Sequence, residues 1–284
     1  MRPGKNTGLA IRGPVLGKHM HKSMIVAIGL TQLTWGEETA GGHARVALLV
    51  SSSTYQSGKT LQAAVSIEYE PGWHGYWVNP GEGGMKTEVK WTLPPGWTAG
   101  PLQFPVPHRE MTGGLSCYGY AGKILVPVRF TAAADARGDV EIQGKLSWLA
   151  CNDKGCVPGE AGLKVKLGAG AELPGGDADL IRKACEALPV VDEKVKLAVE
   201  EKDSNVHIRL TGVGHLDLEG AEIFPVTEQA LDPGAPILLK KSADGFETTV
   251  KKNEYAKRRI DTLELLVAGV GLKKALLVAW KQKG

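Results

Sequence analysis

The feature that most constrains this chain is an alternation of apolar and polar residues that recurs along much of its length. Within residues 61–69 the odd-numbered positions are apolar and three of the four even-numbered ones are polar. A period of two also runs through residues 140–148 and 161–167. This period is typical of strands that bury one face in a core and expose the other to water. The sequence therefore predicts a protein built mainly of β-strands.

Turn-forming residues separate these runs. Pro-Gly pairs stand at residues 71–72, 80–81 and 95–96, and both residue types favour tight turns. Many short strands joined by frequent turns favour antiparallel sandwiches over alternating helices and strands. Because a chain of 284 residues is longer than one compact core needs, we predict an all-β protein with two tandem antiparallel β-sandwich domains.

One helix is expected between these domains. Asp177 or Asp179 can cap it and Pro189 stops it, and its apolar face would carry Leu180, Ile181, Ala184 and Leu188. Residues 168–179, which precede it, are rich in Gly, Ala and Pro, as linkers are. The predicted organisation is a leader (1–40), a first sandwich (41–172), a linker helix (173–190) and a second sandwich (191–284).

The alternation resumes after this helix. Residues 195–199 and 206–210 flank Asp203-Ser-Asn205 and predict a hairpin. Further strands are expected over residues 246–250, 263–267 and 275–280. No repeat of short fixed period is visible, which argues against solenoids and propellers.

The N-terminal residues predict export. A basic stretch at residues 18–22 precedes an apolar run at residues 24–33, about half of the roughly 20 residues that span a bilayer. This favours a secretory signal peptide over a buried N-terminal helix, with Met20 as an alternative start and residues 39–41 as a candidate cleavage region. The mature chain would then be soluble, without a membrane span, in a compartment that permits disulfides. The net charge of +3 arises in this leader. The rest of the chain therefore lacks the excess of positive charge that is typical of nucleic-acid-binding proteins.

Four cysteines are too few for a disulfide scaffold, so any bridge needs a specific task. Cys151 and Cys156 lie at facing ends of a predicted hairpin, where opposed Cα atoms are about 4.5–5.5 Å apart and a disulfide forms easily. The chain-entropy model gives so short a loop only about 2 kcal/mol of stabilisation. Thiol–disulfide exchange is a better reason for such a bridge, but spacing alone leaves both an exchange site and a structural staple open.

The sequence around this pair resembles a known family. The segment Trp148-Leu-Ala-Cys151-Asn-Asp-Lys-Gly-Cys156-Val-Pro158 is similar to the redox loop in the N-terminal periplasmic domain of the DsbD/ScsB thiol:disulfide interchange family. Residues 75–81, 91–101 and 118–127 carry further similar motifs. The resemblance covers residues 44–168 and extends weakly to Glu222-Ile-Phe-Pro225, as in longer ScsB-like members with two immunoglobulin-like domains.

This resemblance implies an immunoglobulin-like fold and a relay of reducing equivalents. In the family, a membrane domain and a thioredoxin-like domain reduce the cysteine pair, which then reduces exported proteins. Carried over, Cys151 and Cys156 are the redox pair, and Cys156 forms the mixed disulfide with a partner. The family's cap loop would fall on residues 115–119, with Cys117 where the best-known members have a bulky aromatic residue. Tyr76, Trp77 and Tyr118 would line the same site.

The remaining cysteines and histidines allow further interpretations. Cys117 could be a third redox thiol or a small loop residue, and Cys185 is expected as a small buried residue of the linker helix. A Cys117–Cys185 bridge also stays open. His74 and His108 could join the cysteine pair in a metal site, for which copper(I) is the candidate ion, but the tight ligand spacing of structural zinc sites is missing.

The tryptophans of the first half divide into two expected groups. Alternation places Trp91 and Trp148 in the core. Trp73, Trp77 and Trp97 stand within two residues of a Gly and could line a groove for a sugar or peptide, although core packing is the usual role of tryptophan.

We therefore expect a periplasmic protein that catalyses thiol–disulfide exchange through Cys151 and Cys156, without cofactor or metal. Its expected partners are a separate thioredoxin-like or membrane electron donor and exported proteins with disulfides. The alternatives are an exported binding or assembly module with a purely structural disulfide, and a copper-handling protein.

Overall fold

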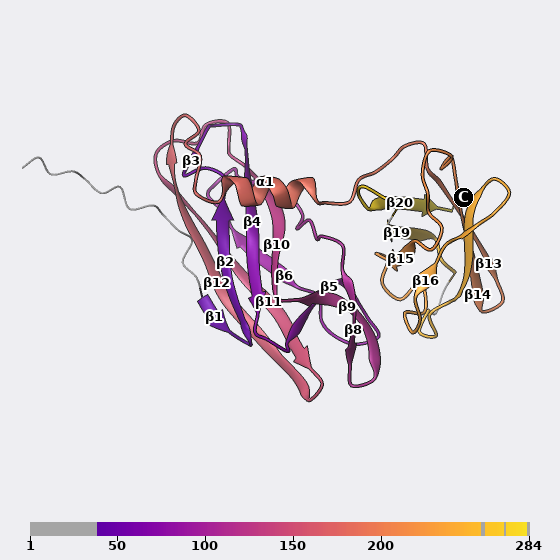
Figure 1. The fold of residues 1–284 in the computed structure, drawn as a ribbon. Helices are drawn as coiled ribbons and strands as arrows, with labels where there is room; N and C mark the ends of the chain where they lie inside the picture. The colour runs from indigo at the N-terminus through magenta and orange to yellow at the C-terminus, as the bar shows by residue number, and fades with distance from the viewer. Residues whose placement is uncertain (1–38, 257–258, 270, 283–284) are drawn as a thin grey trace, which may run out of the picture. The chain divides into compact units, whose positions relative to one another are not determined.

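The computed structural model describes residues 39–256, 259–269 and 271–282. Within these residues the chain forms β-sheets and a single helix (Figure 1), so the all-β prediction is confirmed. The expected leader lies outside the described residues except for Thr39 and Ala40. These two belong to strand β1 (Thr39–Gly41), which pairs with the strand that follows it.

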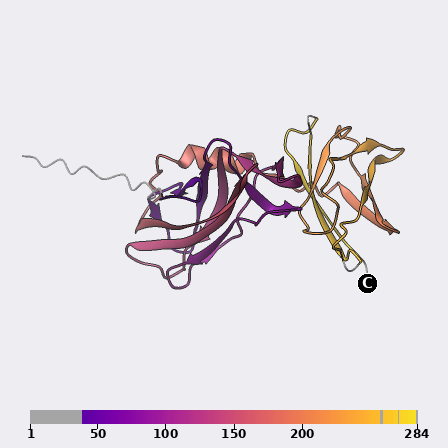
Figure 2. The same ribbon diagram turned by 90° about the horizontal axis from the view of Figure 1, so that it is seen from below.

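The first sandwich consists of two sheets around a common core (Figures 1 and 2). One sheet has the order β1-β2-β4-β10-β7, with β2 (Ala44–Val50), β4 (Thr60–Tyr69), β7 (Thr98–Ala99) and β10 (Lys123–Thr131). The other has the order β3-β12-β11-β5-β9-β8, with β6 also paired to β11. Its strands are β3 (Thr54–Tyr55), β5 (His74–Gly81), β6 (Glu88–Thr92), β8 (His108–Thr112), β9 (Leu115–Ala121), β11 (Val140–Asn152) and β12 (Gly155–Ala169).

Alternating apolar residues fill the space between these sheets. Val65 on β4 and Phe130 on β10 belong to the same buried cluster as Ile142 and Leu146 on β11. Lys145, which lies between Ile142 and Leu146 along the strand, is exposed. The period of two read from the sequence thus decides which face of β11 enters the core.

Trp148 is the largest core side chain of β11 and is fully buried. Its indole Nε1 donates a hydrogen bond to the carbonyl oxygen of Gly42 at 3.0 Å. The ring lies against Gly159 of β12, where an added Cβ would stand 2.2 Å from an indole carbon. The hairpin that carries the cysteines is therefore anchored to the core through this tryptophan.

The tryptophans expected to line a groove do not form one. Trp77 and Trp97 are buried in the core, and Trp73 stacks on His43 at 3.6 Å between ring centroids. The groove prediction is wrong for Trp77 and Trp97 because both rings point into the core, whatever turns the nearby Gly and Pro residues make.

Helix α1 (Ala178–Glu186) packs on the first sandwich, against β2, β4 and β10. Asp177 occupies the N-cap position, but its side chain makes no capping hydrogen bond. Ile181 is buried, whereas Leu180 is exposed, so the expected apolar face is wrong at Leu180. A helix on a sheet surface buries a narrow stripe, and neighbouring residues lie about 100° apart around the axis.

The second sandwich has its own core. One sheet has the order β13-β14-β18-β17 and the other β16-β15-β19-β20. The strands are β13 (Lys196–Lys202), β14 (Asn205–Thr211), β15 (Glu222–Pro225), β16 (Ile237–Leu238), β17 (Lys240–Lys241), β18 (Gly245–Lys251), β19 (Thr262–Ala268) and β20 (Leu276–Lys281). Ile208, Ile223 and Leu265 meet in the cluster between the sheets. Strands β13 and β14 form the predicted hairpin.

Two other features bear on function. No helix in the described part of the chain is long and apolar enough to cross a bilayer.

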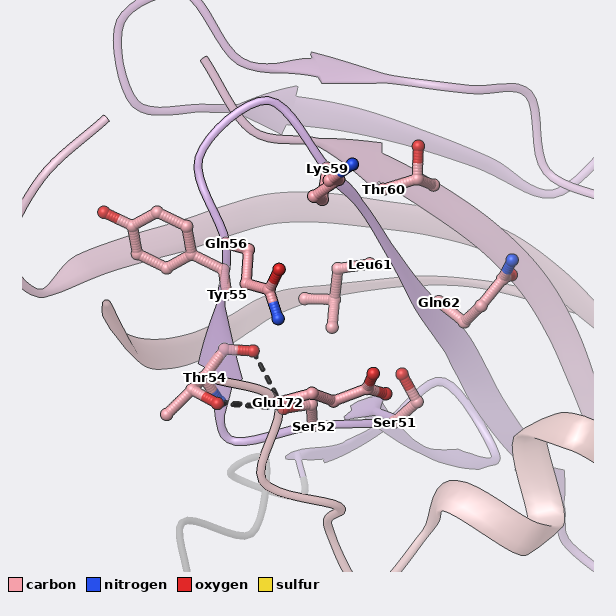
Figure 3. A pocket seen from close by; sticks show the side chains of 10 residues that line it. All are labelled: Ser51, Ser52, Thr54, Tyr55, Gln56, Lys59, Thr60, Leu61, Gln62 and Glu172. Atoms are coloured by element: carbon pink, nitrogen blue, oxygen red, sulfur yellow. Dashed lines mark hydrogen bonds between the residues drawn. The ribbon is translucent and has the colours of Figure 1, made fainter. Parts of the chain in front are cut away.

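A pocket of about 310 Å³ opens beside β3 (Figure 3). In it the hydroxyl of Ser52 lies 3.2 Å from that of Thr54 and donates to the Thr54 carbonyl oxygen at 2.8 Å. These hydroxyls thus satisfy a local turn, and no cysteine lines this pocket.

Candidate functional site

The tip of the β11–β12 hairpin carries two cysteines. The strands pair continuously up to this tip, where Cys151 stands directly opposite Cys156. Their Cα atoms are 4.1 Å apart and their sulfur atoms form a disulfide. The Asn152 side-chain oxygen accepts hydrogen bonds from the backbone N–H groups of Lys154 at 2.8 Å and Gly155 at 3.1 Å. The turn therefore holds the two cysteines in register.

The two cysteines differ in exposure although they face each other. Cys151 is fully buried at 0% exposure. Cys156 is exposed, as are its neighbours Gly155 and Val157. Since exchange requires a thiolate to reach one sulfur of the disulfide, solvent-borne thiols meet Cys156 first.

Cys151 is buried by a small cluster on the outer face of its sheet. Trp148 and Ala150 point into the core of the sandwich, so alternation places Leu149 and Cys151 on the opposite face. There Cys151 belongs to a cluster with the buried side chains of Tyr76 and Cys117. Aromatic and sulfur-bearing groups thus replace the water that would otherwise meet this cysteine.

His74 lies beside Cys151 in the sheet. It is the Cα partner of Cys151 in the β5–β11 pairing and is 7% exposed. Opposed residues of an antiparallel pair share a face, with Cβ atoms about 4.5–5.5 Å apart. Cys156, Cys151 and His74 therefore form a row across β12, β11 and β5.

Thr112, at the end of β8, joins His74 to the next residue of the cluster. Its hydroxyl oxygen lies 2.8 Å from Nε2 of His74 and 3.1 Å from the phenol oxygen of Tyr76. The His74 and Tyr76 rings also meet edge to face, with centroids 5.6 Å apart. These contacts fasten the tip of the β8–β9 hairpin over the outer face.

The loop after β5 covers the other side of the cluster. The Cys117 thiol donates a hydrogen bond to the carbonyl oxygen of Gly83 at 3.2 Å. Gly84 has a φ of +115° and lies so close to Tyr76 that an added Cβ would stand 2.3 Å from a ring carbon. Only glycine adopts this backbone readily and leaves room for the ring. The loop and the β8–β9 tip together form the cap of the site.

Burial controls the ionisation of these groups. It lowers the pKa of His74 below its ordinary value, against a smaller opposite effect of the Glu110 and Asp153 carboxylates. Burial raises the pKa of the Tyr76 phenol and of the Cys117 thiol. At neutral pH the cluster thus favours a neutral imidazole, a protonated phenol and a protonated thiol.

The structure separates the residues that the sequence assigned to the site. Tyr76 and Cys117 lie in the cluster with Cys151. Trp77 and Tyr118 instead pack edge to face in the main core, with ring centroids 6.2 Å apart. This correction follows from the period of two: each is the chain neighbour of a residue on the outer face, so its own side chain points inward.

The segment expected as a cap loop is a strand. Leu115–Ala121 is β9, and the turn before it contains Gly113 and Gly114, with φ of +58° and +85°. Two consecutive positive φ values are typical of the tight turns that join hairpin strands. The cap at this point is therefore a hairpin tip, and the Gly-Gly pair was the signal for it.

Sequence reasoning missed the roles of His74 and Thr112. It considered His74 only as a metal ligand together with His108, which is exposed on β8. Within the described residues no group of three or more His, Cys, Asp or Glu side chains is placed to hold a metal ion. Only the strand register reveals that His74 stands opposite Cys151. Cys117 and Cys185 are free thiols.

Comparison with known proteins bears on this hairpin. Residues 45–166 match the family model described as "Thiol:disulfide interchange protein DsbD, N-terminal". The first sandwich is thus similar to the DsbD N-terminal domain. The matched segment of the DsbD N-terminal domain includes both bridged cysteines, His74 and the whole cap.

Solved structures extend the comparison to the fold. The crystal structure of the N-terminal periplasmic domain of ScsB from Proteus mirabilis matches with a TM-score of 0.64 and 19% identity, covering 88% of this chain and 97% of that chain. The predicted immunoglobulin-like fold is thereby confirmed. The YadV chaperone structure reaches a TM-score of 0.23 at 9% identity, covering 83% of this chain and 99% of that one. No curated protein sequence matches the chain.

Proposed function

We propose that this protein is a thiol–disulfide exchange relay in which Cys151 and Cys156 alternate between disulfide and dithiol. The match of residues 45–166 to the DsbD N-terminal domain supports thiol–disulfide exchange as the reaction class. The observation that carries the proposal is the contrast between a buried Cys151 and an exposed Cys156 in one bridge. An exchange site needs one sulfur within reach of a foreign thiolate and benefits from a shielded second one.

The proposed reaction begins at the exposed sulfur. A thiolate of the electron donor attacks Sγ of Cys156, the S–S bond breaks, and the electron pair of that bond leaves on Cys151. The donor is then joined to Cys156 in a mixed disulfide. A second donor thiolate attacks the donor sulfur of that bond and releases Cys156, so two electrons reach the pair and the donor becomes a disulfide. The reverse sequence reduces a disulfide of the acceptor protein.

The proposed partners are proteins: a thioredoxin-like or membrane-bound electron donor, and exported proteins that accept the electrons in the periplasm. Exposed apolar side chains support a protein-binding role at the site, namely Met111 and Leu115 at the β8–β9 tip and Val157 next to Cys156. The chemistry requires no cofactor, because sulfur atoms carry both electrons.

The reduction potential tests this proposal against a structural staple. The purified protein is equilibrated with glutathione and thioredoxin buffers, and its free thiols are alkylated and counted by mass spectrometry. Structural disulfides typically have potentials below about −300 mV, whereas exchangeable ones are more oxidising. We expect the Cys151–Cys156 pair to titrate above about −300 mV. A pair that stays oxidised in every buffer would contradict the proposed function.

Matched single-cysteine variants test the order of attack. Cys151→Ala leaves the exposed cysteine alone, and Cys156→Ala leaves the buried one alone. With oxidised glutathione we expect Cys151→Ala to form a mixed disulfide at Cys156 at least about tenfold faster than Cys156→Ala forms one at Cys151, because a buried thiol is less accessible and less ionised. Peptide mapping assigns the modified cysteine. Equal rates would contradict attack at Cys156.

A further inference from the structure

Opening of the disulfide leaves a negative charge on a buried sulfur atom. In the proposed function, on which this inference rests, the leaving sulfur is that of Cys151, which is 0% exposed and lies in a cluster with Tyr76 and Cys117. A thiolate is strongly disfavoured in apolar surroundings unless a partner stabilises or protonates it. A proton donor beside Cys151 would remove this cost, and the same group as a base would regenerate the attacking thiolate.

His74 occupies the position for such a group. It is directly opposite Cys151 across the β5–β11 pairing, on the side away from Cys156. Its Nε2 atom is held 2.8 Å from the hydroxyl oxygen of Thr112. This is the hydrogen bond that its ring makes within the described residues, so Nδ1 is left for another partner. Nδ1 is the ring nitrogen closer to the backbone, and the Cβ atoms of opposed residues lie about 4.5–5.5 Å apart.

We propose that His74 is the acid–base residue of this site and exchanges a proton with Sγ of Cys151. When a donor thiolate attacks Cys156, protonated His74 gives its proton to the departing Cys151 sulfur, which leaves a thiol and a neutral imidazole. In the reverse step neutral His74 removes that proton. The Cys151 thiolate then attacks Cys156 of the mixed disulfide, the disulfide re-forms, and the partner leaves as a thiolate.

The surroundings of His74 suit this exchange. The titratable groups near it are Tyr76 on its own strand, Glu110 on β8 and Asp153 in the β11–β12 turn. Cys117 on β9 packs with Tyr76 and Cys151 in the neighbouring cluster. Burial lowers the pKa of His74 and the two carboxylates partly oppose this. The imidazole is therefore available as a base near neutral pH, and its protonated form is a stronger acid than an exposed histidine.

Stopped-flow kinetics with dithiobis(nitrobenzoate) can isolate the proton-dependent step. The fully reduced protein, in a Cys185→Ala background, first attacks the reagent through Cys156 and releases one coloured thiolate. Cys151 then resolves the mixed disulfide and releases a second one. General base catalysis typically contributes about 10²–10⁴-fold. We expect His74→Gln to slow the second release at least about tenfold near pH 6.5 and to leave the first release unchanged.

The pH profile separates a proton-transfer role from a structural one. Glutamine can still hydrogen-bond to Thr112 but does not titrate. In the wild type, the rate of the second release should stay nearly constant as the pH is lowered just below neutral. In His74→Gln the rate should fall in proportion to the ionised fraction of an ordinary thiol. His108→Gln, which changes the exposed histidine on β8, is the matched control and should follow the wild type.

The outcomes distinguish this inference from the proposed function. Wild-type rates and pH dependence of the second release in folded His74→Gln would overturn the role of His74 and leave the exchange function intact. A wild-type protein that never shows a second release would overturn the exchange function itself. Thermal unfolding verifies that each variant folds. If His74→Gln fails to fold, His74→Asn serves as the second non-titrating variant.

Discussion

Cys151 and Cys156 face each other at one level of the same hairpin, yet Cys151 is fully buried and Cys156 is exposed. The difference arises because β11 has neighbours on both sides while the tip of β12 has solvent beyond it. A side chain on the outer face of β11 is covered by residues of β5 and β9. The same disulfide therefore has a protected sulfur and an accessible one.

The loop after β5 should respond to a single methyl group at Gly84. Gly84→Ala adds a Cβ that would stand 2.3 Å from the Tyr76 ring at a φ of +115°, so we expect a loss of about 2 kcal/mol in the free energy of unfolding. Gly113→Ala, at a φ of +58° with nothing within 4 Å of the added Cβ, should cost about 1 kcal/mol. Urea unfolding measures both, and an equal loss would argue against a tight cap.

The two free thiols should differ in reactivity. Cys117 is fully buried under the loop, whereas Cys185 on α1 is partly exposed. Burial raises the pKa of both thiols, but access differs, so in the oxidised protein we expect iodoacetamide to modify Cys185 at least about tenfold faster. Mass spectrometry of the peptides follows both reactions. Faster modification of Cys117 would mean that the cap opens readily in solution.

The anchor of the hairpin should depend on one glycine of β12. Gly159→Ala places a Cβ 2.2 Å from the Trp148 indole, whereas Gly162→Ala on the same strand meets nothing within 4 Å. We expect Gly159→Ala to cost about 3 kcal/mol of stability and Gly162→Ala to change it by at most about 0.5 kcal/mol. Tryptophan fluorescence during urea unfolding reports both. Similar stabilities would show that Trp148 moves aside without cost.

Acid should destabilise the wild type more than His74→Gln. Burial lowers the pKa of His74 in the folded state, so as the pH falls below about 6.5 the unfolded chain binds a proton before the folded one does. The wild type thus loses stability from about pH 6.5 down to the folded-state pKa, and below that pH the loss is complete. Urea midpoints of the two proteins, compared from about pH 7.5 to 5, measure the difference. A constant difference across this range would contradict the lowered pKa.

Local patterns of the sequence were sufficient for the strands, the two sandwiches and the bridged hairpin. Alternation along residues 140–148 and 161–167 sets which side chains enter a core, and the short segment between Cys151 and Cys156 requires a tight turn. Both properties depend on neighbours within a few residues along the chain. The family motifs added the expectation of exchange chemistry at this turn.

The tertiary structure alone decided what lies beside each cysteine. Register across β5, β11 and β12 places His74 opposite Cys151. The loop after β5 and the β8–β9 tip, which are separate in sequence, bury Tyr76 and Cys117 against Cys151. A one-residue shift of that register would reverse every face, and no local pattern in the chain records it. The sequence by itself thus determined the strands and the disulfide, whereas only long-range strand pairing determined the surroundings of the two sulfur atoms, because these surroundings come from segments far apart in the chain.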